Sequence, residues 1–254
     1  MAVDNTGVIS LAQVSIALFK FPKNTLNDVE LEKIIQLLNQ KSLKSGGESP
    51  VDGFTEVRHS RIGKRDEILI EYLIEAPVSQ RTVQILPTGE LAWTQNVFFA
   101  PKILHAHIRP HSGIIEFYTS DKRFINRLLA EIRDCLRPVR ELELEKFGFN
   151  EEILEHILSK NEELMRVKFD QLDHTYLKEI ILKGDLLEAS EEFKYYRTQR
   201  NAKFNEFHLK FYTRDGTLLS LVVNRFGNLR LFRSTSELTW EMIEEFIDEL
   251  EQFL

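Results

Sequence analysis

Two segments of the chain share one order of features, and this repetition constrains the fold more than any single motif. Each runs through a turn, a glycine, an apolar strand, a Ser/Thr-rich turn and an amphipathic helix, first over residues 109–136 and again over 224–254. Gly113 in the first copy corresponds to Gly227 in the second. Internal repeats indicate an architecture built from similar units. We therefore expect an α+β protein with two related halves, each an antiparallel sheet with a helix. The alternative is that the two strand–turn–helix units are unrelated, since they share few identities.

The first half predicts a strand, a helix, several strands and a second helix. Apolar residues at 11–21 favour a strand, and Asn27 with Glu30 forms a capping-box pattern ahead of a helix. Strand patterns then dominate residues 54–118 before a helix that Ser120 can cap. The first half is therefore a strand-rich unit closed by a helix.

The second half follows the same logic after a connector. We expect an N-terminal sheet-and-helix half at residues 1–140, a helical connector at 141–165 and a C-terminal sheet-and-helix half at 166–254. Within the last of these, Arg214-Asp215-Gly216 predicts a hairpin turn between two strands.

The repeated unit, RPHSGIIEFYTSDKRFINRLLAEIRDCL in the first copy and NRFGNLRLFRSTSELTWEMIEEFIDELEQFL in the second, resembles the second part of each repeat in the TATA-binding-protein-like fold. The resemblance covers about 30 residues in each half. It implies a curved antiparallel sheet followed by a long helix. It implies no functional residue, because this chain is acidic and has no matching pair of intercalating phenylalanines.

Charge is distributed unevenly, and this limits the partners that the chain can bind. Residues 1–140 hold 18 Lys+Arg against 16 Asp+Glu, whereas residues 141–254 hold 15 against 24, which together give the net charge of −7. A protein that coats nucleic acid uniformly is basic throughout. Nucleic acid could therefore touch only local patches here, and the acidic half favours a basic partner.

Several classes of site and location are excluded or disfavoured. Cys135 is the only cysteine, so neither an intrachain disulfide nor a four-cysteine zinc site is possible. No apolar run approaches the roughly 18 residues of a membrane span, and no secretory signal is recognisable. No phosphate-binding loop or nucleophile motif occurs either. We expect a cytoplasmic or otherwise intracellular protein with no membrane partner, no catalytic residue and no cofactor.

One histidine-rich strand is a candidate metal site. Alternation places His105, His107 and Arg109 on the same face. Two imidazoles at this spacing lie about 7 Å apart along a strand, which is close enough to share a metal ion. No third ligand is evident nearby in the sequence. The alternative is a solvated sheet face.

Two basic segments are candidate nucleic-acid contacts. Cations that neutralise phosphate, beside rings that stack on bases, are typical of single-strand binding. The alternative is a solvated loop or helix face. The residues are Arg58, Arg61, Lys64 and Arg65 in the first segment, and Lys194, Tyr195, Tyr196, Arg197, Arg200 and Lys203 in the second.

Two further surfaces are candidate protein contacts. Phe98 and Phe99 fall in a predicted tip between strands, where adjacent phenylalanines could dock a partner. The alternative is a loop that folds back over the core. Glu241, Glu245 and Asp248 fall on the predicted solvent side of the last helix, and they favour either a basic partner or a solvated face.

These patterns predict a non-enzymatic interaction module, a subunit or accessory factor of a larger protein or nucleoprotein assembly. Its expected partner is another protein or a second copy, with nucleic acid at local basic loops. The alternative is a metal-dependent enzyme or metal-binding protein centred on His105 and His107.

Overall fold

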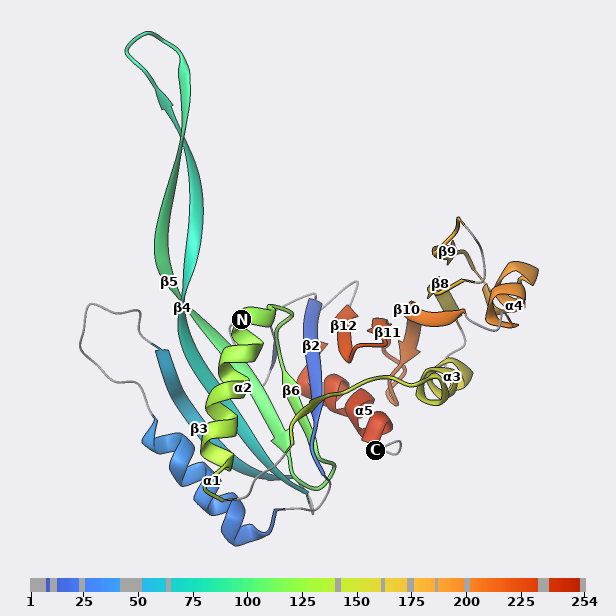
Figure 1. Ribbon diagram of the computed structural model, residues 1–254, viewed down its shortest axis with the longest axis horizontal. Coiled ribbons are helices and arrows are strands. Elements are labelled where there is room, and N and C mark those ends of the chain that lie inside the picture. The colour runs from blue at the N-terminus through green and yellow to red at the C-terminus, as the bar shows by residue number, and fades with distance from the viewer. Residues whose placement is uncertain are drawn as a thin grey trace.

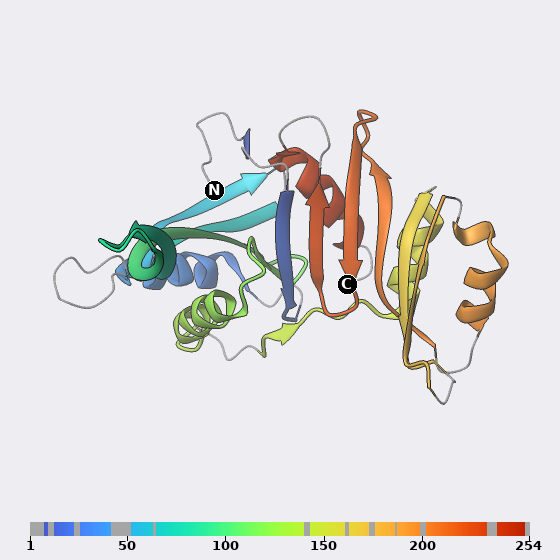
Figure 2. The ribbon, with the colours of Figure 1, turned by 90° about the horizontal axis from the view of Figure 1, so that it is seen from above.

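One antiparallel sheet of eleven strands organises the protein, and α-helices cover both of its faces (Figures 1 and 2). The computed structural model describes residues 8–9, 13–22, 26–41, 52–62, 65–139, 143–160, 163–172, 176–185, 187–198, 202–232 and 238–251. The helices are α1 (Asp28–Gln40), α2 (Lys122–Leu136), α3 (Glu151–Lys160), the 3₁₀ helix η1 (Leu187–Ala189), α4 (Glu191–Thr198) and α5 (Trp240–Glu251). The predicted α+β class is confirmed.

The strands follow a path across the sheet that differs from their order in the chain. They are β1 (Val8–Ile9), β2 (Gln13–Lys20), β3 (Asp52–Ile62), β4 (Arg65–Ile85), β5 (Leu91–Arg109), β6 (Ile114–Phe117), β7 (Glu145–Lys146), β8 (Glu163–Asp170), β9 (Glu179–Lys183), β10 (Lys203–Tyr212), β11 (Leu218–Asn224), β12 (Asn228–Phe232) and β13 (Leu238–Thr239). The order in the sheet is β3-β4-β5-β6-β2-β12-β11-β10-β8-β9, and β7 also pairs with β2. β1 and β13 pair separately.

The first long strand, β2, joins the strands of both predicted halves into one sheet. It pairs with β6 on one side and with β12 on the other, each time antiparallel. β6 and β12 are the strands of the two repeated units. The division at residues 140 and 165 and the TATA-binding-protein-like arrangement remain predictions.

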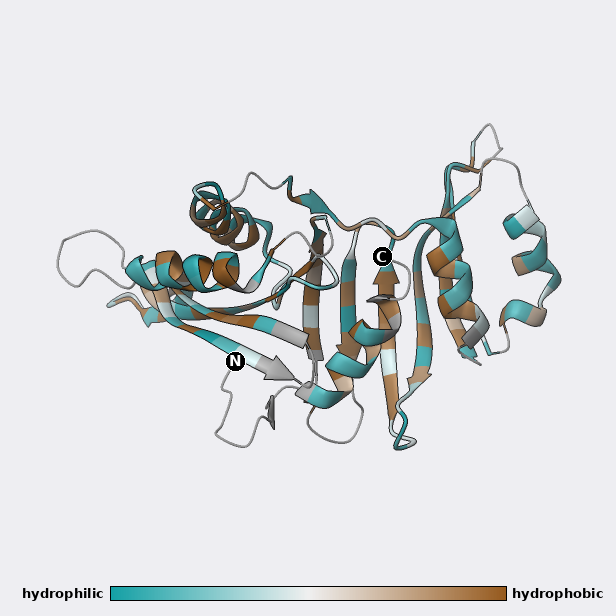
Figure 3. Ribbon diagram, turned by 90° about the horizontal axis from the view of Figure 1, so that it is seen from below, coloured by the Kyte–Doolittle hydropathy of each residue, from teal (hydrophilic) through white to brown (hydrophobic). Residues whose placement is uncertain are grey.

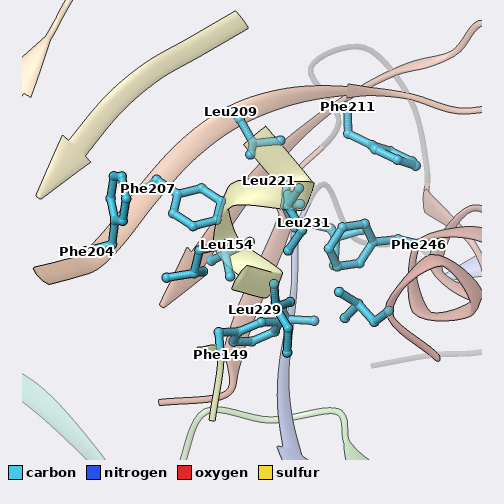
Figure 4. Close-up of a cluster of buried hydrophobic side chains, with 14 of the residues drawn as sticks. Phe149, Leu154, Phe204, Phe207, Leu209, Phe211, Leu221, Leu229, Leu231 and Phe246 are labelled. Carbon is cyan, nitrogen blue, oxygen red and sulfur yellow. The ribbon is translucent and has the colours of Figure 1, made fainter. Parts of the chain in front are cut away.

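Alternate side chains of β2 enter two different cores, because successive residues of a strand point to opposite faces. Val14, Ile16 and Leu18 join the first core, which α3 and α5 cover (Figure 4). Ala17 and Phe19 join the second core, which α1 and α2 cover. Helices therefore lie on opposite faces of the sheet, and brown and teal bands alternate along its strands (Figure 3).

Helix starts follow local capping chemistry. The capping box is confirmed, since Asn27 accepts a hydrogen bond from the Glu30 N–H at 3.0 Å and the Glu30 carboxylate accepts one from the Asn27 N–H at 2.9 Å. The predicted cap at Ser120 is one residue off. Asp121 is the N-cap of α2, and its carboxylate accepts from the Arg123 N–H at 3.0 Å.

β4 and β5 form a long two-stranded arm that projects from the body of the molecule (Figure 1). They pair from Ile68↔Ile108 out to Ile85↔Leu91, around a turn at Pro87-Thr88-Gly89. β3 reaches only Ile74 of β4, and β6 reaches only Ala106 of β5. Beyond these points the two strands pair only with each other among the described residues.

The connector is only partly helical, so the prediction of a helix across it is wrong in part. α3 covers Glu151–Lys160, but Glu145–Lys146 forms β7 and pairs with β2. Phe147 and Phe149 then enter the first core, with their rings edge to face at 5.0 Å. Burying these two rings favours an extended segment over a continuous helix. No helix in the described part of the chain is long and apolar enough to cross a membrane.

Candidate functional site

The arm formed by β4 and β5 carries large apolar side chains on one face, in two stretches that Ser79, Arg81 and Gln95 separate. Odd-numbered residues of both strands point to one side, because every register pair joins two odd or two even numbers. Val83 lies opposite Trp93, and Ile85 lies opposite Leu91. The apolar arm face consists of Val83, Ile85, Leu91, Trp93, Val97, Phe99 and Ile103.

This face is open to solvent along most of its length. Ile85 is 76% exposed, Trp93 70% and Phe99 58%. Arg81, Trp93, Thr94 and Gln95 border a hollow of about 360 Å³ midway along the arm. Soluble proteins rarely leave so many large apolar side chains uncovered on one face unless that face binds something. The arm face is therefore a candidate binding surface.

The prediction that Phe98 and Phe99 sit at a tip is wrong. Both lie inside β5, paired with Val78 and Pro77. The alternative of a loop folded over the core is wrong as well, because Phe98 is 46% exposed. The two rings lie on opposite faces of the arm, and only Phe99 belongs to the apolar arm face.

A second candidate lies at the base of the arm, on the same side of the sheet, where a charge cluster is buried beneath α5. Arg109 is fully buried at the end of β5. Its Nη1 donates to Glu67 of β4 at 2.9 Å, its Nε donates to Glu116 of β6, and its Nη2 pairs with Glu244 of α5. Asp248 of α5 lies 3.8 Å from Nη1. Side chains from β4, β6 and α5 thus converge on one guanidinium of β5.

His107 and Tyr118 extend this cluster. The Tyr118 hydroxyl donates to Glu116 and lies 3.4 Å from Nδ1 of His107. That nitrogen is also 3.8 Å from the Glu244 carboxylate and 3.9 Å from Glu116. His107 is 8% exposed. The alternative of a solvated histidine face is therefore wrong.

Burial and neighbouring charges set the protonation states of the cluster. Burial lowers the pKa of His107 well below its usual value, and the Arg109 guanidinium lowers it further, so the ring is neutral. Burial and the negative charge of Glu116 raise the pKa of Glu244 to about 7. Burial opposes the charge of Arg109, but Glu116 and Glu244 outweigh it and raise the pKa of Arg109 above its usual value.

Three members of the cluster lie close enough together to hold one metal ion. One ligand atom from each of Glu67, His107 and Glu244 lies within 4.8 Å of the others. Two carboxylates far away in the chain, Glu67 and Glu244, thus join His107, whereas His105 of the predicted pair is not among the three. Glu67 is 2% exposed, and the Glu244 side chain is 22% exposed.

His105 lies beside this trio on the same face of β5. Its Nδ1 is 3.7 Å from a Glu71 oxygen, while its buried Nε2 has no hydrogen-bond partner in the described part of the chain. Burial is the main cause that lowers the pKa of His105, although the Glu71 charge opposes it. The predicted shared face of His105, His107 and Arg109 is confirmed.

Sequence reasoning missed Glu67, Glu116 and Glu244. Glu116 had a detectable signal, since it is the one charged residue of the otherwise apolar strand Ile114–Phe117, and a carboxylate in such a strand needs a buried partner. Glu67 had none, because the strand around it alternates ordinarily. Glu244 had none either, because it lies among other acidic residues of the last helix, yet its side chain pairs with Arg109.

The predicted acidic surface of the last helix is partly used within the molecule. The Glu245 carboxylate accepts a hydrogen bond from the Arg214 N–H at 2.6 Å, and Asp248 faces Arg109. Glu241 is exposed. Contact between this helix and a basic partner remains a prediction.

The two basic segments lie at opposite ends of the sheet. The first belongs to the β3–β4 hairpin at one edge, and the second is on and after α4, which follows β9 at the other edge (Figure 2). They do not form one surface. In the first, Arg58 pairs with Glu56 at 2.9 Å. Lys64 and the side chains of Arg61 and Arg65 lie outside the described residues.

In the second segment, acidic neighbours take up part of the charge. Arg197 pairs with Glu155 at 2.7 Å, and Lys194 pairs with Glu191 at 3.1 Å. Tyr195 is 61% exposed, whereas Tyr196 packs against the first core. Lys203 is exposed, and Arg200 lies outside the described residues. Nucleic-acid binding remains a prediction for both segments.

Comparison with known proteins adds no family to this description. No family model matches the chain, and a search of curated proteins finds no match either.

Proposed function

We propose that the chain is a non-enzymatic interaction module that self-associates through its apolar arm face. The observation that carries this proposal is the exposure of seven large apolar side chains on one side of a projecting arm. Protein partners cover such surfaces, and the apolar area removed from water stabilises the complex.

Area and charge favour a second copy as the partner. With roughly 180 Å² for a large apolar side chain, the exposed fractions give on the order of 700 Å² per copy. A standard interface buries about 800 Å² per partner. Arg81 and Glu90 are the only charged residues between residues 76 and 101, so charge does not select a differently charged partner. A two-fold axis would stack two arm faces against each other, as in an isologous dimer.

Phe98 and Phe99 provide a matched pair of test positions, because they are neighbours on opposite faces of the same strand. Sedimentation velocity from about 1 to 100 μM should show a monomer–dimer equilibrium for the natural chain. We expect Phe99→Asp to be monomeric throughout and Phe98→Asp to dimerise like the natural chain. Because the contact is apolar, raising the salt concentration should not weaken it.

An arm-shortened variant checks that the rest of the molecule is not responsible. Replacing residues 80–96 by Asn-Gly joins Ser79 and Val97, which face each other across the arm. This variant should keep its circular dichroism spectrum and be monomeric. A monomeric natural chain at about 100 μM, or equal weakening by both phenylalanine substitutions, would refute self-association through this face.

A further inference from the structure

The charge cluster beneath α5 is a second candidate site, and it does not depend on the arm. We propose that Glu67, His107 and Glu244 bind one divalent first-row transition metal ion, Zn²⁺ or Mn²⁺, with His105 hydrogen-bonded to a water on that ion. The site is assembled from β4, β5 and α5.

The spacing of the ligand atoms fits a single ion. Ligand atoms about 2.1 Å from a tetrahedral zinc lie about 3.4 Å from one another. Here the three ligand atoms lie within 4.8 Å of each other, and Nδ1 of His107 is 3.8 Å from the Glu244 oxygen. Small side-chain rotations therefore bring them onto one centre.

Arg109 orients two of the ligands without occupying them. It contacts one oxygen of Glu67 and one oxygen of Glu244, and a carboxylate has two oxygens. Among the described residues, four carboxylates surround this one guanidinium, which leaves an excess of three negative charges when all are ionised. A divalent cation reduces that excess in a buried place where charge is costly. Arg109 is thus a positioning residue.

His105 gives an independent reason to place a ligand here. Its Nε2 is buried and has no hydrogen-bond partner in the described part of the chain, and such atoms call for a missing partner. The two imidazoles are two residues apart on one strand face, about 7 Å along the strand. A metal ion on His107 and a water on that ion span about this distance, which brings the water within hydrogen-bonding reach of His105.

The donor set selects the class of metal. Imidazole together with carboxylate suits Zn²⁺ and Mn²⁺, whereas Mg²⁺ and Ca²⁺ prefer oxygen alone. The site has three protein ligands, so a position remains open to water. We therefore expect Mg²⁺ and Ca²⁺ to bind much more weakly than Zn²⁺.

Calorimetry tests the proposal on chain purified without a histidine tag and freed of metal with EDTA. Zn²⁺, Mn²⁺ and Mg²⁺ are titrated separately into the natural chain and into Glu67→Gln, His107→Gln and Glu244→Gln. We expect one Zn²⁺ per chain and at least about a hundredfold weaker binding in each variant. His105→Gln should weaken binding about tenfold, as expected for an outer partner.

Glu206→Gln is the matched control. The Glu206 side chain is 21% exposed against 22% for Glu244, and it also pairs with an arginine, Arg166, but it has no part in the trio. It should bind Zn²⁺ like the natural chain. Circular dichroism checks that each variant folds, and if Glu67→Gln does not fold, the His107 and Glu244 variants decide.

Three results would overturn the proposal. The first is no saturable binding of Zn²⁺ or Mn²⁺ by the natural chain up to about 1 mM. The second is unchanged affinity in folded His107→Gln and Glu244→Gln. The third is an equal loss of affinity in Glu206→Gln, which would indicate nonspecific binding to surface carboxylates.

Discussion

Gly227 occupies a junction of three chain segments, and replacing it with alanine should destabilise the protein strongly. It lies in the turn between β11 and β12 with φ +74°. Its carbonyl accepts a hydrogen bond from the Leu18 N–H at 2.8 Å, and the Leu18 carbonyl accepts one from the Phe147 N–H at 3.0 Å. An added Cβ would overlap the Phe147 carbonyl oxygen and lie 3.2 Å from the Leu18 oxygen. Backbone, which cannot rotate away, surrounds the position.

The expected loss of unfolding free energy in Gly227→Ala combines two contributions. A non-glycine residue in the left-handed region costs about 1 kcal/mol. Relieving the overlap requires movement of the Phe147 backbone, which weakens the hydrogen bonds that join β2 to its neighbours. Losing one or two of these costs about 1–3 kcal/mol, since buried groups are left unsatisfied. We expect Gly227→Ala to lower the free energy of unfolding by about 3 kcal/mol.

Gly216 provides the matched control because it shares the conformation without the crowding. Its φ is +80°, and an added Cβ would meet nothing within 4 Å. Gly216→Ala should therefore cost only about 1 kcal/mol. In urea, with a slope of about 3 kcal/mol per molar, the two midpoints should differ by about 0.7 M. If the free energies of unfolding of the two variants agreed within about 0.5 kcal/mol, the crowding at Gly227 would not destabilise the protein, which would refute this prediction.

Two further predictions concern buried charge and pH. Arg109→Met should lower the unfolding free energy of the metal-free chain by about 3–5 kcal/mol, because it leaves buried carboxylates without their cation. Arg166→Met, at a side chain that is 32% exposed, should lower it by about 1 kcal/mol or less. Equal losses of unfolding free energy in the two variants, measured by urea unfolding, would contradict this prediction. Burial lowers the pKa of His208 below 6.5, and the Arg166 charge lowers it further. The stability that the neutral ring contributes is therefore present above pH 6.5 and is lost as the pH falls through the lowered pKa. The urea midpoint should therefore drop less between pH 7.5 and 5 in His208→Gln than in the natural chain, and an equal drop would show that His208 does not contribute.

Local chemistry allowed much of the fold to be predicted. The Asn27 capping box and the turns at Pro87-Thr88-Gly89 and Arg214-Asp215-Gly216 depend on residues a few positions apart, so the sequence alone reveals them. Pro77 and Pro101 hide the arm in the sequence, because proline usually breaks a strand. A ribbon with no outer neighbours tolerates proline, since the missing N–H has no partner to lose.

The charge cluster was less predictable than the arm. The shared face of His105, His107 and Arg109 follows from alternation within one strand. Glu67 and Glu244, however, lie 42 and 135 positions from Arg109 in the sequence. Only the pairing of β4 with β5 and the position of α5 over the sheet bring them together. No local pattern encodes those distances.

The central position of β2 has a consequence for synthesis. β2 is complete at Lys20, whereas β6 ends at Phe117 and β12 at Phe232. β12 therefore emerges from the ribosome about 210 residues after β2. At 5–20 residues per second, the interval is roughly 10–40 s. For that time one edge of β2 has no β12 to pair with, and contacts so distant in sequence also slow folding. The nascent chain therefore has to protect β2 from wrong pairing until β12 has been made.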